Sequence, residues 1–501
     1  MNRSAIPWVA AAVVFAVHLA GNPHYGFFRD ELYFIICGFH PQFGYVDQPP
    51  LVPLLSALTQ LGGHSLFLLR AVPAVFAAAG VYTTCLLVTE YGGGAFAQIL
   101  ASLVFLFTGV LMSFGMKVST DTVGLWTWPL LALLVVRLSK GADQRLWLLA
   151  GLIAGITIES KYSVVFFLAA LILGLMLTPH RRLLRTSWFA AGLAVMILIA
   201  LPNFLWQWHY GFPMFQLLQA GQSGKNISVG PILYVAQEII ITGLFLAVVW
   251  IVGLVWLFRS TSFRFLAYAY VVLIAEMMLF HGKHYYPADV YPILIASGAV
   301  AIEAWTRVRG VTRAAITAAV IVVGVFSLPT SLPVLPESAY VAYASRLSRA
   351  LHIPNSATQT EHGRDEGNLP GDWADMHGWP ELAASVEAVY KSLSPAERSQ
   401  AVVFAGNYGE ASAVAFFTPN IPVISEHNQY WLWGPRGNRG NVLVQIGGTC
   451  FRSDRLFASR TFAATAKSRW AMAYENNLPI WICRGIKKPL ADVWPSIKSY
   501  E

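Results

Sequence analysis

Two adjacent acids, Asp30 and Glu31, stand in the segment that follows the first long apolar run of the chain. A carboxylate in such a place is suited to take a proton from a hydroxyl or an amine during group transfer. Neighbouring residues of a helix point about 100° apart, so we expect the two acids to have separate roles. We predict that Asp30 is the base. The local sequence also fits an alternative, in which Asp30 caps a helix over 31–39.

A further acid, Asp121, follows Lys117 by four residues. If this stretch is helical, the two side chains share one face and are able to pair. The pattern Thr120-Asp121-Thr122 is also typical of a helix cap in front of the next apolar run. Both interpretations stand at this point.

Three cations, Arg29, Lys161 and Lys283, are suited to an anionic leaving group. A departing phosphate gains negative charge, and fixed cations that stabilise this charge lower the barrier to transfer. Arg offers two parallel hydrogen bonds to a phosphate, while Lys acts as a compact point charge. For Lys283 the alternative is a lysine that only reaches from the membrane edge to water.

A metal site is the other chemistry that these segments suggest, through His281, His284 and Asp289. Their spacing matches no standard metal-binding motif, and hydrogen bonding near a headgroup layer explains them better. We therefore expect no required metal ion and no other cofactor.

The elements that carry these residues are membrane helices. Hydrophobic residues make up 56% of the 501-residue chain and charged residues only 12%, where soluble domains have about 25%. The net charge of +8 comes from basic residues in short loops between apolar runs, where orienting the chain is their usual role. This distribution argues against nucleic-acid binding.

A helix needs about 20 apolar residues to cross the hydrocarbon of a bilayer. On this basis we predict about eleven spans, at residues 5–21, 65–89, 95–113, 122–138, 146–160, 161–178, 188–206, 231–258, 264–280, 286–305 and 314–331. The run 146–178 is divided because Glu159 and Lys161 lie at its centre.

Placing the N-terminus in the cytoplasm puts most loop cations on the inner side, as the positive-inside rule requires. These inner residues are Lys140, Arg145, Arg181, Arg182, Arg185, Arg259, Arg264, Arg307, Arg309 and Arg313. An odd number of spans then places the C-terminal third outside. On the same topology ten polar residues approach the outer face: Arg29, Asp30, Glu31, Asp47, Lys117, Asp121, Lys161, His281, Lys283 and His284. Because charges near hydrocarbon are costly unless paired or wet, we predict one shared aqueous cavity.

The outer segments are the remaining parts of the chain. Residues 22–64 and 207–230 are long and rich in aromatic side chains, which predicts helices along the membrane surface. The tail, 336–501, has short apolar runs at 401–405 and 442–446 and a helix-like stretch at 381–392, typical of a small α/β domain. Within it, Asn407-Tyr-Gly-Glu410 is interpreted as a strand-to-helix turn rather than a site. Cys450 and Cys483 either pair or stay free.

Four segments of the chain resemble the GT-C membrane glycosyltransferases of the protein O-mannosyltransferase and aminoarabinose transferase type, families 39 and 83. They are Arg29-Asp-Glu-Leu-Tyr33 with Gly44-Tyr-Val-Asp-Gln-Pro-Pro-Leu51, Lys117-Val-Ser-Thr-Asp-Thr122, Gly155-Ile-Thr-Ile-Glu-Ser-Lys-Tyr-Ser163, and Gly282-Lys-His-Tyr-Tyr-Pro287 with Tyr291-Pro292. The resemblance spans most of residues 1–305. It implies a polytopic α-helical GT-C domain over 1–335, with amphipathic juxtamembrane helices in the first outer loop (22–64), and a soluble α/β domain over 336–501.

The resemblance also implies roles for residues. Asp30 matches the first-loop acid of the family, with Glu31 beside it, and Asp121 matches a second acid of the same cavity. Contacts to the donor lipid phosphate are implied for the cations and two tyrosines, Arg29, Lys117, Lys161, Tyr162, Lys283 and Tyr286, and further places in the cavity for Asp47 and His284. The chain departs from the aminoarabinose branch, which has a Glu-Lys-Pro step near Asp47-Gln-Pro49, so that lysine's phosphate contact is missing here or supplied by Arg29 or Lys161.

The implied function is that of an inverting hexosyl- or pentosyltransferase. The donor is a polyprenyl-phosphate sugar, and the acceptor is a lipid, glycan or protein on the outer face of a bacterial inner membrane. Two other classes remain as alternatives. A transporter or flippase of lipid-linked sugars usually has repeated halves, which the sequence lacks. A scaffold with a partner-binding tail leaves the clustered acids unexplained.

Overall fold

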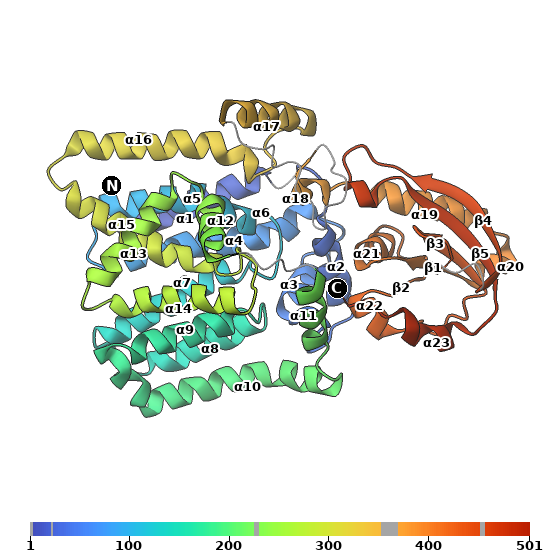
Figure 1. The fold of residues 1–501 in the computed structure, drawn as a ribbon, viewed down its shortest axis with the longest axis horizontal. Helices are drawn as coiled ribbons and strands as arrows, with labels where there is room; N and C mark the ends of the chain where they lie inside the picture. Colours follow the sequence, from blue (N-terminus) through green and yellow to red (C-terminus); the bar gives the residue numbers. More distant parts are fainter. Residues whose placement is uncertain (1–3, 22–23, 225–229, 352–368, 451–455, 501) are drawn as a thin grey trace.

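The computed structural model describes residues 4–21, 24–224, 230–351, 369–450 and 456–500. Figure 1 shows a bundle of helices on one side and a twisted sheet with its own helices on the other. The helices α2 and α3 lie between these two parts, next to α21 and α22.

The bundle is built from the apolar runs of the first two thirds of the chain. Its helices are α1 (Ile6–Gly21), α4 (Leu66–Glu90), α5 (Ala95–Phe107), α6 (Gly109–Met116), α7 (Gly124–Ser139), α8 (Leu146–Ile158), α9 (Val164–Met176), α10 (Ser187–His209), α12 (Pro231–Thr242), α13 (Ala247–Arg259), α14 (Arg264–Leu279), α15 (Tyr291–Trp305) and α16 (Gly310–Ser327). Each predicted span coincides with one of these helices or with a pair. Within the described residues, four helices are long and apolar enough to cross a membrane, or up to seven if each bent pair is one span. The predicted count of about eleven spans stays a prediction.

Two of the longer runs are broken in different ways. The division of 146–178 is confirmed, because α8 ends at Ile158 and α9 begins only at Val164. The span predicted over 231–258 is not one continuous helix, because α12 and α13 meet at an angle of 118°. The break falls at Gly243, whose φ of +90° ends α12 in a conformation that glycine adopts without steric cost.

The outer segments form α2 (Arg29–Phe39), α3 (Leu51–Leu58) and α11 (Pro213–Gly224). Helices are present in the first outer loop as predicted, and every residue of α2 from Glu31 to Gly38 is buried within the protein. The cause is packing on two sides, against α3 and against α21 of the C-terminal part. At Gly38 the backbone of α2 approaches the carbonyl of Pro53 so closely that no side chain fits there.

The C-terminal part holds α17 (Glu337–Leu351), α18 (Gly371–Ala374), α19 (Trp379–Ser392), α20 (Pro395–Arg398), β1 (Ala401–Ala405), α21 (Tyr408–Phe417), β2 (Val423–Ser425), α22 (Asn428–Trp433), β3 (Val442–Ile446), β4 (Phe457–Ala466), β5 (Leu478–Ile486) and α23 (Leu490–Val493). The strand order is β2-β1-β3-β5-β4, with β1 parallel to both neighbours and β5 antiparallel to both of its own. The predicted strands at 401–405 and 442–446 are confirmed, as is the helix over 381–392. A small α/β sheet domain is therefore present.

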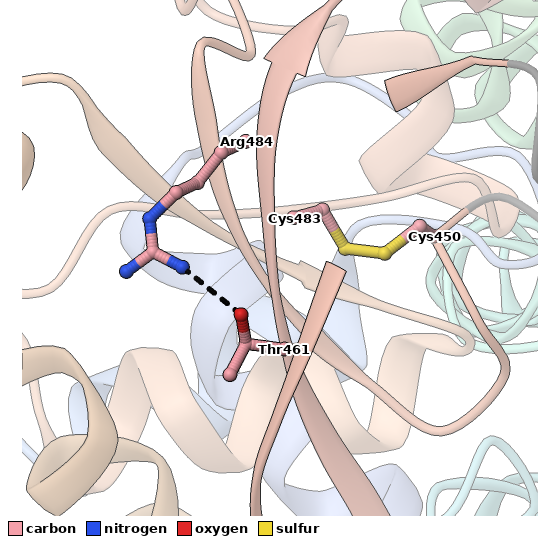
Figure 2. Close-up of a disulfide and its surroundings, with 4 residues drawn as sticks. All are labelled: Cys450, Thr461, Cys483 and Arg484. Atoms are coloured by element: carbon pink, nitrogen blue, oxygen red, sulfur yellow. Dashed lines mark hydrogen bonds between the residues drawn. A yellow bond between two sulfur atoms is a disulfide. The ribbon is translucent and has the colours of Figure 1, made fainter. Parts of the chain in front are cut away.

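A disulfide joins Cys450 to Cys483. Figure 2 shows the bond between a loop residue and strand β5. The side chain of the neighbouring Arg484 extends to the other side of the strand, where it donates a hydrogen bond to Thr461 Oγ1 at 3.4 Å. This settles the alternative between a bond and two free thiols. The other two cysteines, Cys37 and Cys85, are buried and free.

Candidate active site

Contacts between loops bring the four segments of the resemblance together. Glu31 Oε1 accepts a hydrogen bond from the backbone N–H of Val118 at 3.0 Å, which ties α2 to the segment after α6. Ser160 Oγ donates to the carbonyl of Thr120 at 2.8 Å, which ties that segment to the break between α8 and α9.

Two further contacts complete the assembly. The backbone N–H of Leu51 donates to the carbonyl of Glu159 at 2.9 Å and connects the first outer loop with the α8–α9 break. The carboxylate of Asp289 lies against Gly124, where no side chain has room. Segments that are up to about 260 residues apart in sequence thus meet at one end of the bundle, while the predicted aqueous cavity itself stays a prediction.

Asp30 lies in the first turn of α2, and its side chain is 35% exposed. The Tyr408 hydroxyl donates to Asp30 Oδ1 at 2.8 Å. The residue that caps α2 is Phe28, so the interpretation of Asp30 as an N-cap is wrong. Asp30 is therefore a partly accessible carboxylate that accepts from one neutral donor and lies 3.7 Å from the guanidinium of Arg29 (Oδ1 to Nε). Its exposed part leaves it able to accept a proton.

Glu31 points away from Asp30 into the protein, as the helical spacing predicts. Its side chain is 0% exposed and forms an ion pair with Arg70 at 3.2 Å. It also accepts hydrogen bonds from the backbone N–H groups of Phe28 and Val118, at 2.9 and 3.0 Å. The catalytic role predicted for Glu31 stays a prediction, but these three donor groups favour a role in positioning α2.

Arg29 faces the C-terminal part of the chain. Its Nη2 lies 3.3 Å from Asp375 Oδ2, and its Nη1 donates to the Tyr474 hydroxyl at 2.8 Å. Its guanidinium carbon also lies 5.6 Å from the Tyr408 ring centre. Burial raises the pKa of Asp375 to about 6, against the lowering effect of Arg29. Arg29 therefore connects α2 to the C-terminal part.

Lys117 and Asp121 do not pair with each other. The chain is extended at Lys117, directly after α6 ends, so the two residues do not share a helical face. Lys117 Nζ instead lies 2.8 Å from Asp372 Oδ2 and 3.9 Å from the Phe28 ring centre. The predicted pair is thus corrected by the absence of a helix between them.

Asp121 pairs with Lys161, at 2.5 Å between Oδ1 and Nζ. The helix after it, α7, begins at Gly124 with Val123 as N-cap, so helix capping does not account for Asp121. Asp289, which is buried, lies within electrostatic reach of both Asp121 and Lys161. Lys161 therefore forms an ion pair with Asp121 and interacts electrostatically with Asp289.

Aromatic rings surround the Lys161 ammonium. It lies 4.6 Å from the ring centre of Tyr286 and 5.6 Å from that of Tyr285. Lys283 Nζ lies 5.9 Å from the same Tyr285 ring, and His284 makes an edge contact with it. The predicted donor residues Lys161, Lys283 and Tyr286 are thus neighbours, joined through one tyrosine that the sequence analysis did not single out.

Tyr162 and Asp47 lie in two other segments of the loop assembly, the α8–α9 break and the first outer loop. The Tyr162 hydroxyl donates to Asn203 Oδ1 at 2.7 Å, on helix α10. Asp47 accepts from the Tyr33 hydroxyl at 2.9 Å and from Asn428 Nδ2 at 3.1 Å. Burial raises the pKa of Asp47 to about 6 against the lowering effect of the Tyr33 hydrogen bond, with a smaller contribution in the same direction as burial from the carboxylate of Asp30. Asp30 and Asp47 therefore face a common region.

Tyr408 is the contact that sequence reasoning missed. The predicted strand-to-helix turn at 407–410 is confirmed, because Asn407 Oδ1 accepts from the backbone N–H of Glu410 at 2.9 Å and caps α21. The same turn presents Tyr408 to Asp30 across 378 positions of sequence. No local pattern signals a contact of this range.

Comparisons with known proteins found one matching family model and several solved structures of similar fold. Residues 47–206 match the family model described as dolichyl-phosphate-mannose-protein mannosyltransferase. Two solved structures of ArnT from Cupriavidus metallidurans are similar over nearly the whole chain. The apo state matches with 13% identity, a TM-score of 0.61 and coverage of 96% of this chain and 97% of ArnT. The form bound to undecaprenyl phosphate matches with 13% identity, a TM-score of 0.59 and coverage of 95% and 97%.

The chain has the GT-C fold. The predicted resemblance to the GT-C glycosyltransferases of the mannosyltransferase and ArnT type is thereby confirmed, and with it a multi-pass membrane protein. A search of curated protein sequences gave no match. The match to the family model begins at Asp47 and includes Asp121 and Lys161. Asp30 and Lys283 lie outside the matched range.

Proposed function

We propose that this chain is an inverting glycosyltransferase that moves a sugar from a polyprenyl-phosphate donor to an acceptor on the extracytoplasmic face. One observation carries the proposal: the accessible carboxylate of Asp30 stands in the loop assembly that also holds the Lys161–Asp121 pair and Lys283. A base and fixed cations in one assembly are what transfer from a phosphate-linked sugar requires.

The proposed reaction is a single displacement. The acceptor hydroxyl or amine attacks the anomeric carbon, Asp30 takes its proton, and the bond between that carbon and the phosphate oxygen breaks. The leaving polyprenyl phosphate keeps the bonding electrons and gains negative charge, which Lys161 and Lys283 stabilise. One displacement at the anomeric carbon inverts its configuration.

The donor class is supported by the ArnT structure, which is bound to undecaprenyl phosphate. In this chain Lys161, Lys283 and the two tyrosines of the 283–286 segment are suited to the phosphate and to the sugar that it carries. Arg29 and Lys117 are each held by an aspartate of the C-terminal part, so we assign them to holding that part in place rather than to the phosphate. The proposal needs no metal ion, and chelation should leave transfer unchanged.

The orientation is part of the proposal. The basic loop residues gather away from the Asp30 end of the helices, which supports placing that end on the outer face of a bacterial inner membrane. A disulfide in the C-terminal part is compatible with an oxidising compartment.

The experiment uses the full-length protein in liposomes with a panel of radiolabelled polyprenyl-phosphate sugars and an extract of envelope lipids, glycans and proteins. We expect label to move from one donor to an acceptor, with release of the unlabelled polyprenyl phosphate. Movement of an intact donor across the liposome membrane, without release of polyprenyl phosphate, would instead identify a flippase.

A further inference from the structure

An apolar groove lies on the outside of the bundle, far from the candidate active site. It is formed by α13, α15 and α16, and it encloses about 630 Å³. Its lining is apolar throughout and includes Leu246, Val249, Ile302, Trp305, Ile316 and Val320. The volume falls within the range of about 300–1,000 Å³ that ligand pockets have.

The groove exists because α16 packs on the bundle along one edge only. Two contacts join α16 to α5. The Phe107 ring of α5 packs against the backbone of α16 at Gly324, and the guanidinium of Arg313 on α16 lies 4.7 Å from the ring centre of Phe96 on α5. Only 11% of an 18-residue stretch of the α16 span (Gly310–Thr330) is buried, compared with 72% for Ala288–Trp305, which contains α15. Figure 1 shows α16 along the outer edge of the bundle. Its other edge therefore leaves a space beside α13, which hydrocarbon fills in a membrane.

Basic residues stand where the groove ends at the α15–α16 turn. Trp305 forms part of the lining, and the Arg309 guanidinium lies 5.5 Å from its ring centre. Arg307 and Arg309 are both exposed, and neither has an ion-pair partner among the residues that the structure describes. Val308 between them is 92% exposed, so no described side chain covers the space between the two arginines.

This end of the groove is remote from the loop assembly. Helix α15 begins beside Asp289 and ends at Trp305, and its 15 residues span about 22 Å. The groove mouth therefore lies toward the opposite membrane face from Asp30, and its ligand is unconnected with the transfer reaction.

We propose that this groove binds one anionic phospholipid, with an acyl chain between α13 and α16 and its phosphate between Arg307 and Arg309. Arginines bind phosphate oxygens through paired, charge-assisted hydrogen bonds. Basic residues between membrane helices at the cytoplasmic surface are known to recognise anionic headgroups. The lipid completes the packing of α16 and neutralises the arginine pair. A zwitterionic lipid fits the groove but gives its phosphate a compensating charge of its own.

The experiment measures lipid retention by the purified full chain by native mass spectrometry. The probes are phosphatidylglycerol and phosphatidylcholine with identical acyl chains. We expect one phosphatidylglycerol per chain to be retained about tenfold more strongly than phosphatidylcholine. The double variant Arg307→Ala/Arg309→Ala should lose this preference, and Ala319→Trp, which fills the groove, should lose the bound lipid.

The matched control is Arg181→Ala/Arg182→Ala, which removes two cations from another loop of the same membrane face. This control should keep the preference for phosphatidylglycerol. Equal loss in the control and the test variant would overturn the site, since general surface charge would then explain the preference. Displacement of the lipid by polyprenyl phosphate would overturn the choice of occupant.

Discussion

Asp30 and Glu31 show how one position along a helix separates two identical charges. Asp30 faces outward and keeps a third of its side chain accessible, while Glu31 is enclosed with Arg70. An enclosed carboxylate that already accepts from Arg70 and two backbone N–H groups has little capacity to take a substrate proton. We therefore expect substitution of Asp30 to lower the transfer rate and substitution of Glu31 to lower the stability of the fold.

Glu31→Gln should destabilise the protein rather than remove one chemical step. It leaves the Arg70 guanidinium buried without its counter-charge, and breaking a buried pair in this way costs about 3–5 kcal/mol. Thermal unfolding in detergent should show a clearly lower Tm, with Asp30→Asn as the control that keeps the wild-type Tm. A Glu31→Gln protein with normal Tm and no transfer would make Glu31 catalytic instead.

Lys283→Ala should mainly weaken donor use. Its ammonium lies beside Tyr285 next to Lys161, where it is suited to the lipid phosphate. We expect the donor KM to rise about tenfold, corresponding to about 1.4 kcal/mol, while Lys283→Arg restores most of the loss. Steady-state kinetics with varied donor measures both variants. An unchanged donor KM would show that Lys283 does not contact the donor and would favour the alternative of a lysine that reaches from the membrane edge to water.

At the scale of elements, α2 is held between the bundle and α21. The two parts meet at Arg29, whose guanidinium contacts Asp375 and Tyr474. Glu475 lies beside this contact, and its Oε1 accepts from Asn407 Nδ2 at 2.9 Å. The junction between α2 and the C-terminal part therefore contains more carboxyl groups than cations, and its stability should depend on pH.

Burial raises the pKa of Glu475 to about 7, against the lowering effect of Arg29. The folded protein thus keeps a proton on Glu475 that the unfolded chain releases above pH of about 4.5. Its contribution to stability is present below that pH, declines as pH rises to about 7, and stays low above. Glu475→Gln, which mimics the protonated acid, should have a higher Tm than wild type at pH 8 and an equal Tm at pH 4.5.

The control for this pH series is Glu381→Gln, an exposed acid on α19. Its Tm should follow the wild type at every pH. If Glu475→Gln and the wild type also differ by a constant amount across the series, Glu475 does not titrate in this range.

Much of the element structure is predictable from the sequence because hydrophobic run length and turn residues are local signals. The Glu159–Lys161 step gives the α8–α9 break, since charges interrupt a span. The α12–α13 break was missed because Gly243 sits in an unbroken apolar run, where a single glycine does not by itself predict a positive φ. The burial of α2 was missed for a related reason, because the partner that covers it comes from residues 408–417.

At the scale of the whole molecule, the candidate site is shared between the bundle and the C-terminal part. Sequence patterns identify Asp30, Asp121 and Lys161, because each carries a polar group into an apolar setting. They do not give the pairing of Lys161 with Asp121 or the contact of Tyr408 with Asp30, which depend on how distant segments meet. Tyr408 gives the C-terminal part a direct place in the proposed chemistry.

Tyr408→Phe tests that place. Loss of the hydroxyl removes a hydrogen bond to a carboxylate, a kind worth about 1.5–3 kcal/mol, so kcat should fall at least about tenfold. The donor KM should stay unchanged, because Tyr408 contacts the base rather than the donor residues. Tyr390→Phe, whose hydroxyl bonds the carbonyl of Arg398, is the control and should keep full activity. An equal loss in both variants would indicate a structural effect.

The central claim is that Asp30 is the base and that other residues bind the donor. One paired measurement on Asp30→Asn tests this claim most directly. Transfer from the labelled donor and binding of polyprenyl phosphate are measured on the same purified protein. We predict that transfer falls by about 10²–10⁴-fold while binding of polyprenyl phosphate stays within about twofold of wild type. Near-normal transfer by Asp30→Asn would contradict the account.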